Sequence, residues 1–394
     1  MDTALKGLRV VDMGHVVAGP FCASLFGDFG ADVIKIEEPT RGDDYRYMGQ
    51  TAGTSFSIEG RNKRAITLNL RTEKGKAILR EILKDADIVI QNYRPGVMDK
   101  MGFGWEELQK INKRLILVSI SGFGQTGPYS QRPGYDSIGM ALGGLIYVTG
   151  EPSGPPLRPG TVVGDYLTGM MATIGTMFAV YYRDVVGTGV GQIVDASLYE
   201  SVFRTMESTA VEYSLKGTVR ERIGNGHRVT VPSGNFRTKD GKWFAISVGN
   251  NNLFKAFCQC IGREDLIDDP KYATAVARAN DREQIEGIAA KWIEEHTLQE
   301  CLEALNGHVP CAPIYSIEDI FKDPHYKARN AIVDIVDKKF GPISMQGVFP
   351  KLSATPGEVK WSGPPLGDHN NEVYKELLGY DDETLKKLKE EGII

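Results

Sequence analysis

Cysteine is scarce in this sequence, and no apolar run is long enough to cross a membrane. The chain of 394 residues has five cysteines, an odd and dispersed set that argues against a disulfide framework and fits a reducing compartment. No apolar run approaches the roughly 18 residues that a membrane-spanning helix needs. The first residues lead directly into the strand-like "LRVVDM", without the basic and apolar regions of a signal peptide. We therefore expect a soluble cytoplasmic protein with no membrane partner.

Histidine and cysteine pairings that hold metals or make nucleophiles are also missing. The six histidines are scattered, without an HxxxH or HExxH spacing. Cys258 and Cys260 are one residue apart in a helix-like segment, so their side chains would diverge rather than share an ion. We expect no metal site and neither zinc hydrolysis nor Cys/His nucleophilic catalysis.

Positive charge is not in excess. A net charge of -5 and a pI near 5.8 disfavour nucleic acid as a partner. Two basic clusters, "RNKRAITLNLR" from Arg61 to Arg71 and "NYRPGVMDKMG" from Asn92 to Gly102, could instead bind a small polyanion. Solvated surface charge explains either cluster equally well.

The first 200 residues alternate strand-like and helix-like segments. Strands are expected over 8–13, 32–37, 87–90 and 114–122, and helices over 19–30, 72–86 and 105–112. This rhythm is typical of an α/β fold with a parallel, Rossmann-like sheet. The first strand is followed by "GHVVAGP" and not by GxGxxG, so Glu37 at the end of the second strand is weak evidence for a dinucleotide.

A second, smaller domain is expected to begin near residue 220. There "GNGHRVTVPSGNFRTKDGKWFAISVGNN" predicts two short strands around a "KDG" turn. Helices are expected across 281–306 and paired strands across 331–352, before a proline-rich loop and a closing helix pair.

The stretch "TVVGDYLTGMMATIG", residues 161–175, places the carboxylate of Asp165 at the expected start of a helix. An aspartate there can cap the helix, and the free backbone N–H groups and the dipole stabilise its charge. The same groups can stabilise oxyanions in a reaction. The stretch alone does not separate a cap from a catalytic group.

Six longer motifs carry a resemblance along the whole chain. They are "HVVAGPFCASLFGDFGADVIKIEEPTRGDDYR", "NKRAITLNL", "NYRPGVMDKMGFGWEEL", "SISGFGQTGP", "GDYLTGM" and "PPLGDHNNEV". In order and spacing the sequence resembles class III CoA-transferases, the family of formyl-CoA and carnitine CoA-transferases. The resemblance implies an interlocked homodimer. It also implies a large Rossmann-like domain from residues 1–200 and 330–394, a linker over 201–224, and a small α+β domain over 225–329.

The resemblance also implies the roles of particular residues. Asp165 matches the family's nucleophile, which forms an acyl-aspartyl anhydride and then an aspartyl-CoA thioester. CoA would be a substrate and not a tightly bound cofactor. The positions that match CoA-contacting segments are Val17, Ala18, Leu68, Asn69, Leu70, Arg71, Asn92, Tyr93, Arg94 and Lys100. Arg71 and Lys100 are the expected phosphate partners, and Tyr135 is expected beside the acyl group or as an ordinary packed residue.

Departures from the family pattern bear on the substrate. Glu38 stands where formyl-CoA transferases have an arginine, which puts a nucleotide contact in doubt unless Arg41 or Arg46 compensates. Val17 stands where they have a glutamine. Formyl-CoA:oxalate exchange is therefore disfavoured, and a succinyl-type dicarboxylate or a branched or aromatic acid fits better.

Two alternatives remain. α-Methylacyl-CoA racemase shares the implied fold but needs a histidine where this chain has Tyr135, and an unperturbed tyrosine pKa near 10 suits proton shuttling poorly. A non-catalytic CoA-binding subunit is the other alternative. The presence of Asp165 argues against it.

Overall fold

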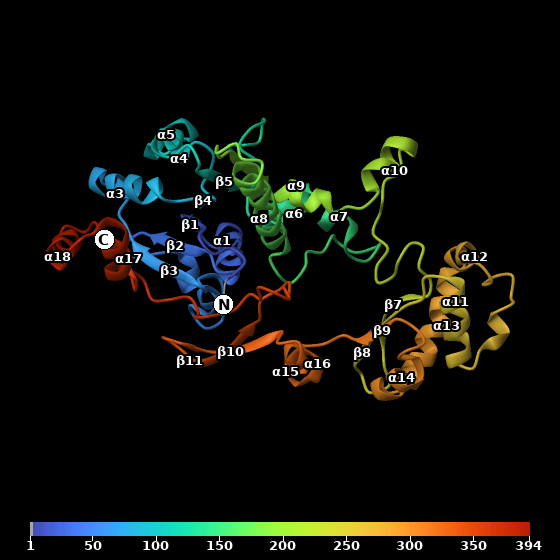
Figure 1. Cartoon of the computed structure of the whole chain (residues 1–394). Helices are drawn as coiled ribbons and strands as arrows, with labels where there is room; N and C mark the ends of the chain where they lie inside the picture. Colours follow the sequence, from blue (N-terminus) through green and yellow to red (C-terminus); the bar gives the residue numbers. More distant parts are fainter. Residues whose placement is uncertain (1–2) are drawn as a thin grey trace. The chain divides into compact units, whose positions relative to one another are not determined.

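The computed structural model describes residues 3–394, which form two compact units (Figure 1). The first unit comprises the residues up to Leu145, Arg158–Val211 and Pro324–Ile394. The second comprises Ile146–Leu157 and Glu212–Asp323. The domain limits expected from the sequence stay a prediction, and by contacts residues 146–157 group with the second unit.

A six-stranded parallel sheet forms the centre of the first unit, in the order β3-β2-β1-β4-β5-β6. The strands are β1 (Arg9–Asp12), β2 (Asp32–Glu37), β3 (Lys63–Thr67), β4 (Ile88–Gln91), β5 (Ile116–Ser121) and β6 (Ile193–Ser197). This confirms the predicted α/β class with a parallel sheet. The order reverses between β1 and β4, and ligands of such sheets bind outside the carboxyl ends of the strands at that point.

Helices cover both faces of this sheet because its strands alternate between two apolar clusters. Val11, Val89 and Leu117 pack on one face with α3, while Val10, Ile88 and Val118 pack on the other with α1 and α8. The helices of the first half are α1 (Ala18–Asp28), α2 (Thr54–Glu59), α3 (Glu73–Lys84), α4 (Val97–Met101), α5 (Trp105–Ile111), α6 (Asp136–Leu142), α7 (Leu145–Val148), α8 (Val163–Asp184) and α9 (Leu198–Arg204).

The last part of the chain returns to the β3 edge of the same sheet. The Tyr374 hydroxyl donates to the carbonyl oxygen of Thr67 at 2.6 Å, and the Trp361 indole N–H donates to that of Lys63 at 3.0 Å. The elements here are α16 (Pro324–Ala328), the antiparallel pair β10 (Ile332–Asp337) and β11 (Gly341–Gln346), α17 (Asn370–Leu378) and α18 (Asp382–Glu390).

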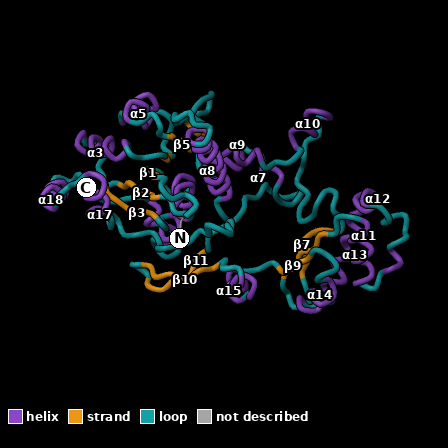
Figure 2. The backbone as a smooth tube through the Cα atoms, in the orientation of Figure 1, coloured by secondary structure: helices purple, strands orange, loops and turns teal. Residues whose placement is uncertain are grey.

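The second unit has a three-stranded antiparallel sheet, drawn in orange in Figure 2, with its own apolar core. Its strands are β7 (Ser233–Arg237), β8 (Trp243–Ser247) and β9 (Cys311–Pro313). Its helices are α11 (Asn251–Cys260), α12 (Ala275–Asn280), α13 (Arg282–Glu295), α14 (Leu298–Leu305) and α15 (Ile317–Lys322), with α10 (Thr209–Lys216) at its boundary. Across residues 3–394 no helix combines the length and the apolar character needed to span a membrane.

Candidate active site

A cavity of about 260 Å³ lies at the carboxyl ends of β1, β4 and β5, where the strand order reverses. It brings together five of the residues singled out from the sequence: Val17, Ala18, Asn92, Tyr135 and Asp165. The other lining residues are His15, Val16, Asp44, Ile120, Ser121, Gly122, Gly134 and Leu198. The cavity therefore combines a carboxylate from α8 with the start of α1.

Asp165 lies in the first turn of α8 but does not cap it. The helix begins at Val163, and its N-cap, Val162, provides no side-chain hydrogen bond. Instead, the backbone N–H of Asp165 donates to Oδ1 of Asp136 at 3.1 Å. Asp136, the first residue of α6, thus satisfies one of the free N–H groups of α8. The Asp165 carboxylate is left to the cavity.

The pKa of Asp165 is raised to about 7 by burial first, and then by the negative charges of Asp136 and Glu59. The helix dipole expected from the sequence acts in the opposite direction, toward the ionised form. Two neighbouring acids and a partly desolvated position outweigh a dipole effect of about 0.3–1 kcal/mol. At neutral pH Asp165 is therefore divided between its acid and carboxylate forms.

Glu59 is a second acid near Asp165 that the sequence did not reveal. It ends α2, is 3% exposed, and accepts a hydrogen bond from the Tyr166 hydroxyl at 3.0 Å. Burial raises its pKa to about 7. Since Tyr166 adjoins Asp165 in α8, the two acids belong to one polar cluster at the start of this helix.

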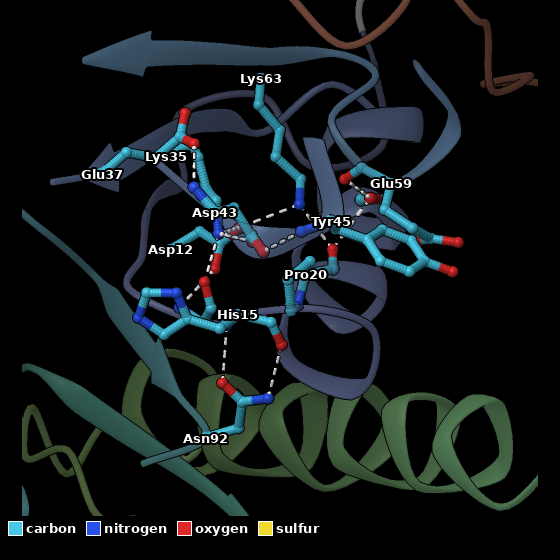
Figure 3. A network of polar contacts seen from close by, with 12 residues as sticks. Asp12, His15, Pro20, Lys35, Glu37, Asp43, Tyr45, Glu59, Lys63 and Asn92 are labelled. Carbon is cyan, nitrogen blue, oxygen red and sulfur yellow. Dashed lines mark hydrogen bonds and ion pairs between the residues drawn. The ribbon is translucent and has the colours of Figure 1, made fainter. Parts of the chain in front are cut away.

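The loop between β1 and α1 is held by the side chain of Asn92 and by a buried group of charged residues (Figure 3). Asn92 accepts from the His15 backbone N–H at 2.7 Å and donates to the His15 carbonyl oxygen at 2.8 Å. Beneath the loop, the Lys63 ammonium lies 2.8 Å from Asp12, and the Lys35 ammonium lies 3.0 Å from Asp43. These four charged side chains are at most 1% exposed. The loop therefore sits on a neutralised ionic cluster.

The first basic cluster of the sequence mostly serves the fold. Lys63 is fully buried against Asp12, Arg61 is bonded to Asp28, and Arg64 pairs with Asp32 at 2.7 Å. Neither proposed explanation, a polyanion site or solvated charge, holds for these three residues. Arg71 alone in this cluster is exposed.

A second recess of about 140 Å³ shares Asn92, Ser121, Gly122, Gly134 and Tyr135 with the Asp165 cavity. It adds Tyr93 and Arg94 from the predicted set, and also Arg132. The Arg132 guanidinium lies over the Tyr129 ring, 3.7 Å from its centroid. Sequence reasoning missed Arg132, although its place in "QRPGYD", three residues before Tyr135, was a signal.

The remaining predicted residues lie outside both cavities. Leu68 is 2% exposed and packs in the core, and Asn69 bonds to the carbonyl oxygen of Gly392 at 3.2 Å. Leu70 and Arg71 follow them, and Lys100 lies exposed near the end of α4. The structure thus separates Arg71 and Lys100 from the immediate surroundings of Asp165.

The residues near Glu38 are held by other protein groups. The Glu38 carboxylate accepts from the backbone N–H groups of Thr40 and Arg41, each at 2.9 Å. Of its suggested substitutes, Arg41 pairs with Asp44 at 3.0 Å, and Arg46 donates to Glu37 at 2.8 Å. Both guanidinium groups are therefore partly neutralised by carboxylates.

Tyr135 is not an ordinary packed tyrosine, because it is 76% exposed. It precedes Asp136 as the N-cap of α6 and lines both cavities. Its position fits a contact with a bound molecule at the rim. Within residues 3–394, no group of three or more His, Cys, Asp and Glu side chains is arranged to hold a metal ion.

Comparison with known proteins gives consistent matches over nearly the whole chain. A family model described as CoA-transferase family III matches residues 5–370. Succinyl-CoA--D-citramalate CoA-transferase of Chloroflexus aurantiacus is 40% identical over 397 residues, which cover 99% of this chain and 98% of the relative. Succinyl-CoA--L-malate CoA-transferase beta subunit of the same organism is 41% identical over 398 residues, with the same two coverages. A CAIB/BAIF family protein from Brucella suis matches in structure with a TM-score of 0.85 and 33% identity, over 96% of this chain and 100% of that one.

Proposed function

The chain belongs to CoA-transferase family III, and from this premise we propose that it moves CoA from succinyl-CoA to an organic acid, with Asp165 as the covalent nucleophile. One observation carries the proposal: the Asp165 carboxylate lines the same cavity as Val17 and Ala18, at the start of α1. The names of the two Chloroflexus relatives, both succinyl-CoA-dependent, support the donor.

The exchange proceeds in four steps. A carboxylate oxygen of Asp165 attacks the thioester carbon of succinyl-CoA, the C–S bond breaks, and CoA leaves as a thiolate. The thiolate then attacks the aspartyl carbonyl of the mixed anhydride and releases succinate, leaving aspartyl-CoA. The acceptor carboxylate attacks that thioester, its C–S bond breaks, and CoA leaves again as a thiolate. This thiolate attacks the acceptor's carbonyl in the new anhydride, which gives the acceptor's CoA thioester and the free carboxylate of Asp165. This relay divides one difficult substitution into easier ones.

The start of α1 supplies the stabilisation that these steps need. Each attack places negative charge on a former carbonyl oxygen. The backbone N–H groups of the first turn have no intrahelical acceptor, and α1 has no side-chain hydrogen bond at its N-cap, Val17. Val17 and Ala18 line the cavity together with Asp165, and we propose that their backbone N–H groups act as the oxyanion donors.

The second recess fits the CoA arm. Arg94 and Arg132 line it and would meet the diphosphate, since guanidinium groups bind phosphate oxygens in pairs. Arg71, in the loop after β3, and Lys100, near the end of α4, remain candidates for the 3′-phosphate. The apolar wall formed by Val17, Ile120 and Leu198 would face the acyl chain.

Detection of a covalent intermediate tests this function. The protein is incubated with succinyl-CoA, and the peptide that carries Asp165 is examined by mass spectrometry for a CoA or succinyl adduct. We expect an adduct on the unsubstituted protein and none on Asp165→Ala. Transfer without an adduct would exclude the covalent route. Exchange of an α-proton of a branched acyl-CoA with deuterated water, again without an adduct, would favour the racemase.

We also propose a homodimer, interlocked as in the family, in the cytoplasm. The exposed side of α8 carries the apolar residues Met171, Ile174, Phe178 and Tyr181, and Val185 follows at its C-cap. Their spacing of three or four residues forms one continuous stripe along the helix. A continuous stripe of five exposed apolar residues is typical of a protein–protein interface. All five cysteines are free, which agrees with a reducing compartment.

A further inference from the structure

Val16, in the wall of the cavity, has an unusual backbone conformation. Its φ is 63°, in the left-handed region. Four non-glycine residues of the described chain, Val16, Asn62, Glu207 and Asn330, have positive φ, and Val16 is the β-branched one among them. A branched side chain makes this conformation costly, so surrounding contacts must hold it.

One contact acts directly on this residue. The backbone N–H of Val16 donates to Oδ1 of Asp43 at 3.0 Å. Asp43 is itself fixed, because its backbone N–H donates to Glu37 at 2.9 Å and its Oδ2 lies 3.0 Å from the Lys35 ammonium. Burial alone would raise the pKa of Asp43, but Lys35 and the backbone donors lower it to about 2. Asp43 is thus a permanently charged, oriented acceptor.

The residues before Val16 are fixed in the same way. The Gly14 backbone N–H donates to Asp12 at 2.8 Å, and its carbonyl oxygen accepts from the Lys35 ammonium. His15 is bound on both backbone groups by Asn92. The backbone of Gly14 and His15 therefore has few alternative conformations. A rotation about the backbone bonds of Val16 would chiefly move the peptide that follows it.

That following peptide carries the N–H of Val17, and α1 begins at Ala18. We propose that Asp43 is a positioning residue that holds Val16 in its left-handed conformation and so aims the Val17 and Ala18 N–H groups at the atoms reacting on Asp165. This inference rests on the proposed function, because it takes Asp165 as the reacting group. Asp43 lines neither of the two cavities, so its proposed action is through the backbone.

The test measures adduct formation on Asp165 in single and double variants. Asp43→Ala removes the acceptor, and we expect the rate to fall roughly 10- to 100-fold, the equivalent of one lost hydrogen bond to a charged group. The KM for succinyl-CoA should change much less than kcat. Asp43→Asn keeps an acceptor oxygen, so its rate of adduct formation should fall less than that of Asp43→Ala. Glycine adopts positive φ without cost, so Val16→Gly should restore part of the rate in the Asp43→Ala protein.

Asp28→Ala is the matched control, because Asp28 is 3% exposed and bonded to Arg61 but has no hydrogen bond to the loop. It should lower thermal stability and leave the rate within about threefold. If Asp43→Ala does not fold, Val16→Pro keeps every buried charge but removes the N–H and the left-handed backbone. This variant should also lose adduct formation.

Full activity of Asp43→Ala or of Val16→Pro would overturn the inference, as would a failure of Val16→Gly to restore any rate. Amide hydrogen exchange at Val16 separates this failure from a failure of the proposed function. If the unsubstituted protein forms no adduct, the proposed function fails. Fast amide exchange at Val16 in Asp43→Ala, but not in Asp28→Ala, would still establish that Asp43 fixes the conformation of Val16. Equal exchange rates in the two variants would refute it.

Discussion

As the proposed nucleophile, Asp165 would have to be ionised to attack, yet its surroundings favour the protonated form. A raised pKa makes the carboxylate a stronger nucleophile but lowers its population below pH 7. Burial sets most of this shift, and the charge of Asp136 adds to it. The side chain of Asp136 thus has two effects, since it also accepts the Asp165 backbone N–H at 3.1 Å.

Asp136→Asn separates these two effects, because an amide oxygen still accepts the hydrogen bond but carries no charge. Loss of the charge lowers the pKa of Asp165, so the acidic limb of the pH–rate profile should move to lower pH. We expect the ratio of the rate at pH 6 to that at pH 8 to rise roughly threefold to tenfold. Glu59→Gln should act in the same direction but less strongly. If the acidic limb of the pH–rate profile stays at the same pH in both variants, the ionisation of Asp165 does not determine that limb.

Asp165→Asn should change the stability of the protein with pH. The folded pKa of about 7 exceeds the ordinary value of 3.8. The stabilisation from the retained proton is present below about pH 4 and is lost as the pH rises through 7. The asparagine variant should therefore gain relative stability between pH 4 and pH 8, by on the order of 4 kcal/mol. Thermal unfolding at both pH values checks this, and a constant difference would contradict it.

At the scale of elements, α6 and α8 approach closely because Gly164 has no side chain. A Cβ atom there would lie 3.0 Å from Oδ1 of Asp136 and 3.2 Å from Cγ of Met140. The side chains of Asp136 and Met140 would have to shift by a few tenths of an ångström to admit it. The residue before Asp165 is thus part of the contact between Asp136 and α8.

Gly164→Ala should therefore weaken the Asp136 contact, costing about 1–3 kcal/mol of stability and at least tenfold in adduct formation. Gly287→Ala in α13 is the control, because a Cβ there meets nothing within 4 Å. It should stabilise the protein by up to about 1 kcal/mol without changing the rate. Equal rates for the two variants would exclude this role for Gly164.

Elements with a single apolar face or run were predictable from the sequence, and those held by distant charges were not. The apolar runs of β1, β2, β4 and β5 marked these strands, and the interpretation of the closing helices was also right. β3 was missed because Lys63 and Arg64 suggested surface charge. Lys63 is buried through its ion pair with Asp12, 51 residues earlier. Such pairing depends on the tertiary fold and leaves no local pattern.

The residues of the candidate site also divide into those that the sequence predicted and those that it did not. Asp165, Val17, Ala18, Asn92 and Tyr135 came from motifs, and the structure places them in one cavity, while their roles stay a proposal. Glu59 reaches Tyr166 across 107 residues of sequence. Burial in the folded protein raises the pKa of Asp165 most, and neighbours of this kind raise it further, so this shift could not be predicted from residues 161–175 alone.

At the scale of the whole molecule, the exposed stripe of α8 bears on assembly. Phe178 is 70% exposed at its middle. Phe178→Glu places a charge in the proposed interface, so freshly made protein should shift from dimer toward monomer in size-exclusion chromatography with light scattering. Val276→Glu, at a residue 72% exposed on α12, is the matched control and should leave the dimer intact. A dimer in both variants would place the interface elsewhere.

The return of the chain to the β3 edge has a consequence for biosynthesis. The contacts of Trp361 and Tyr374 with β3 join residues 298 and 307 positions apart. At roughly 5–20 residues per second, a ribosome needs about 15–60 s to make the intervening chain. During that time the nascent sheet has an open edge strand, which favours pairing with other chains. Delayed elongation should thus raise the demand for chaperones on this protein before its own later segment can close the edge.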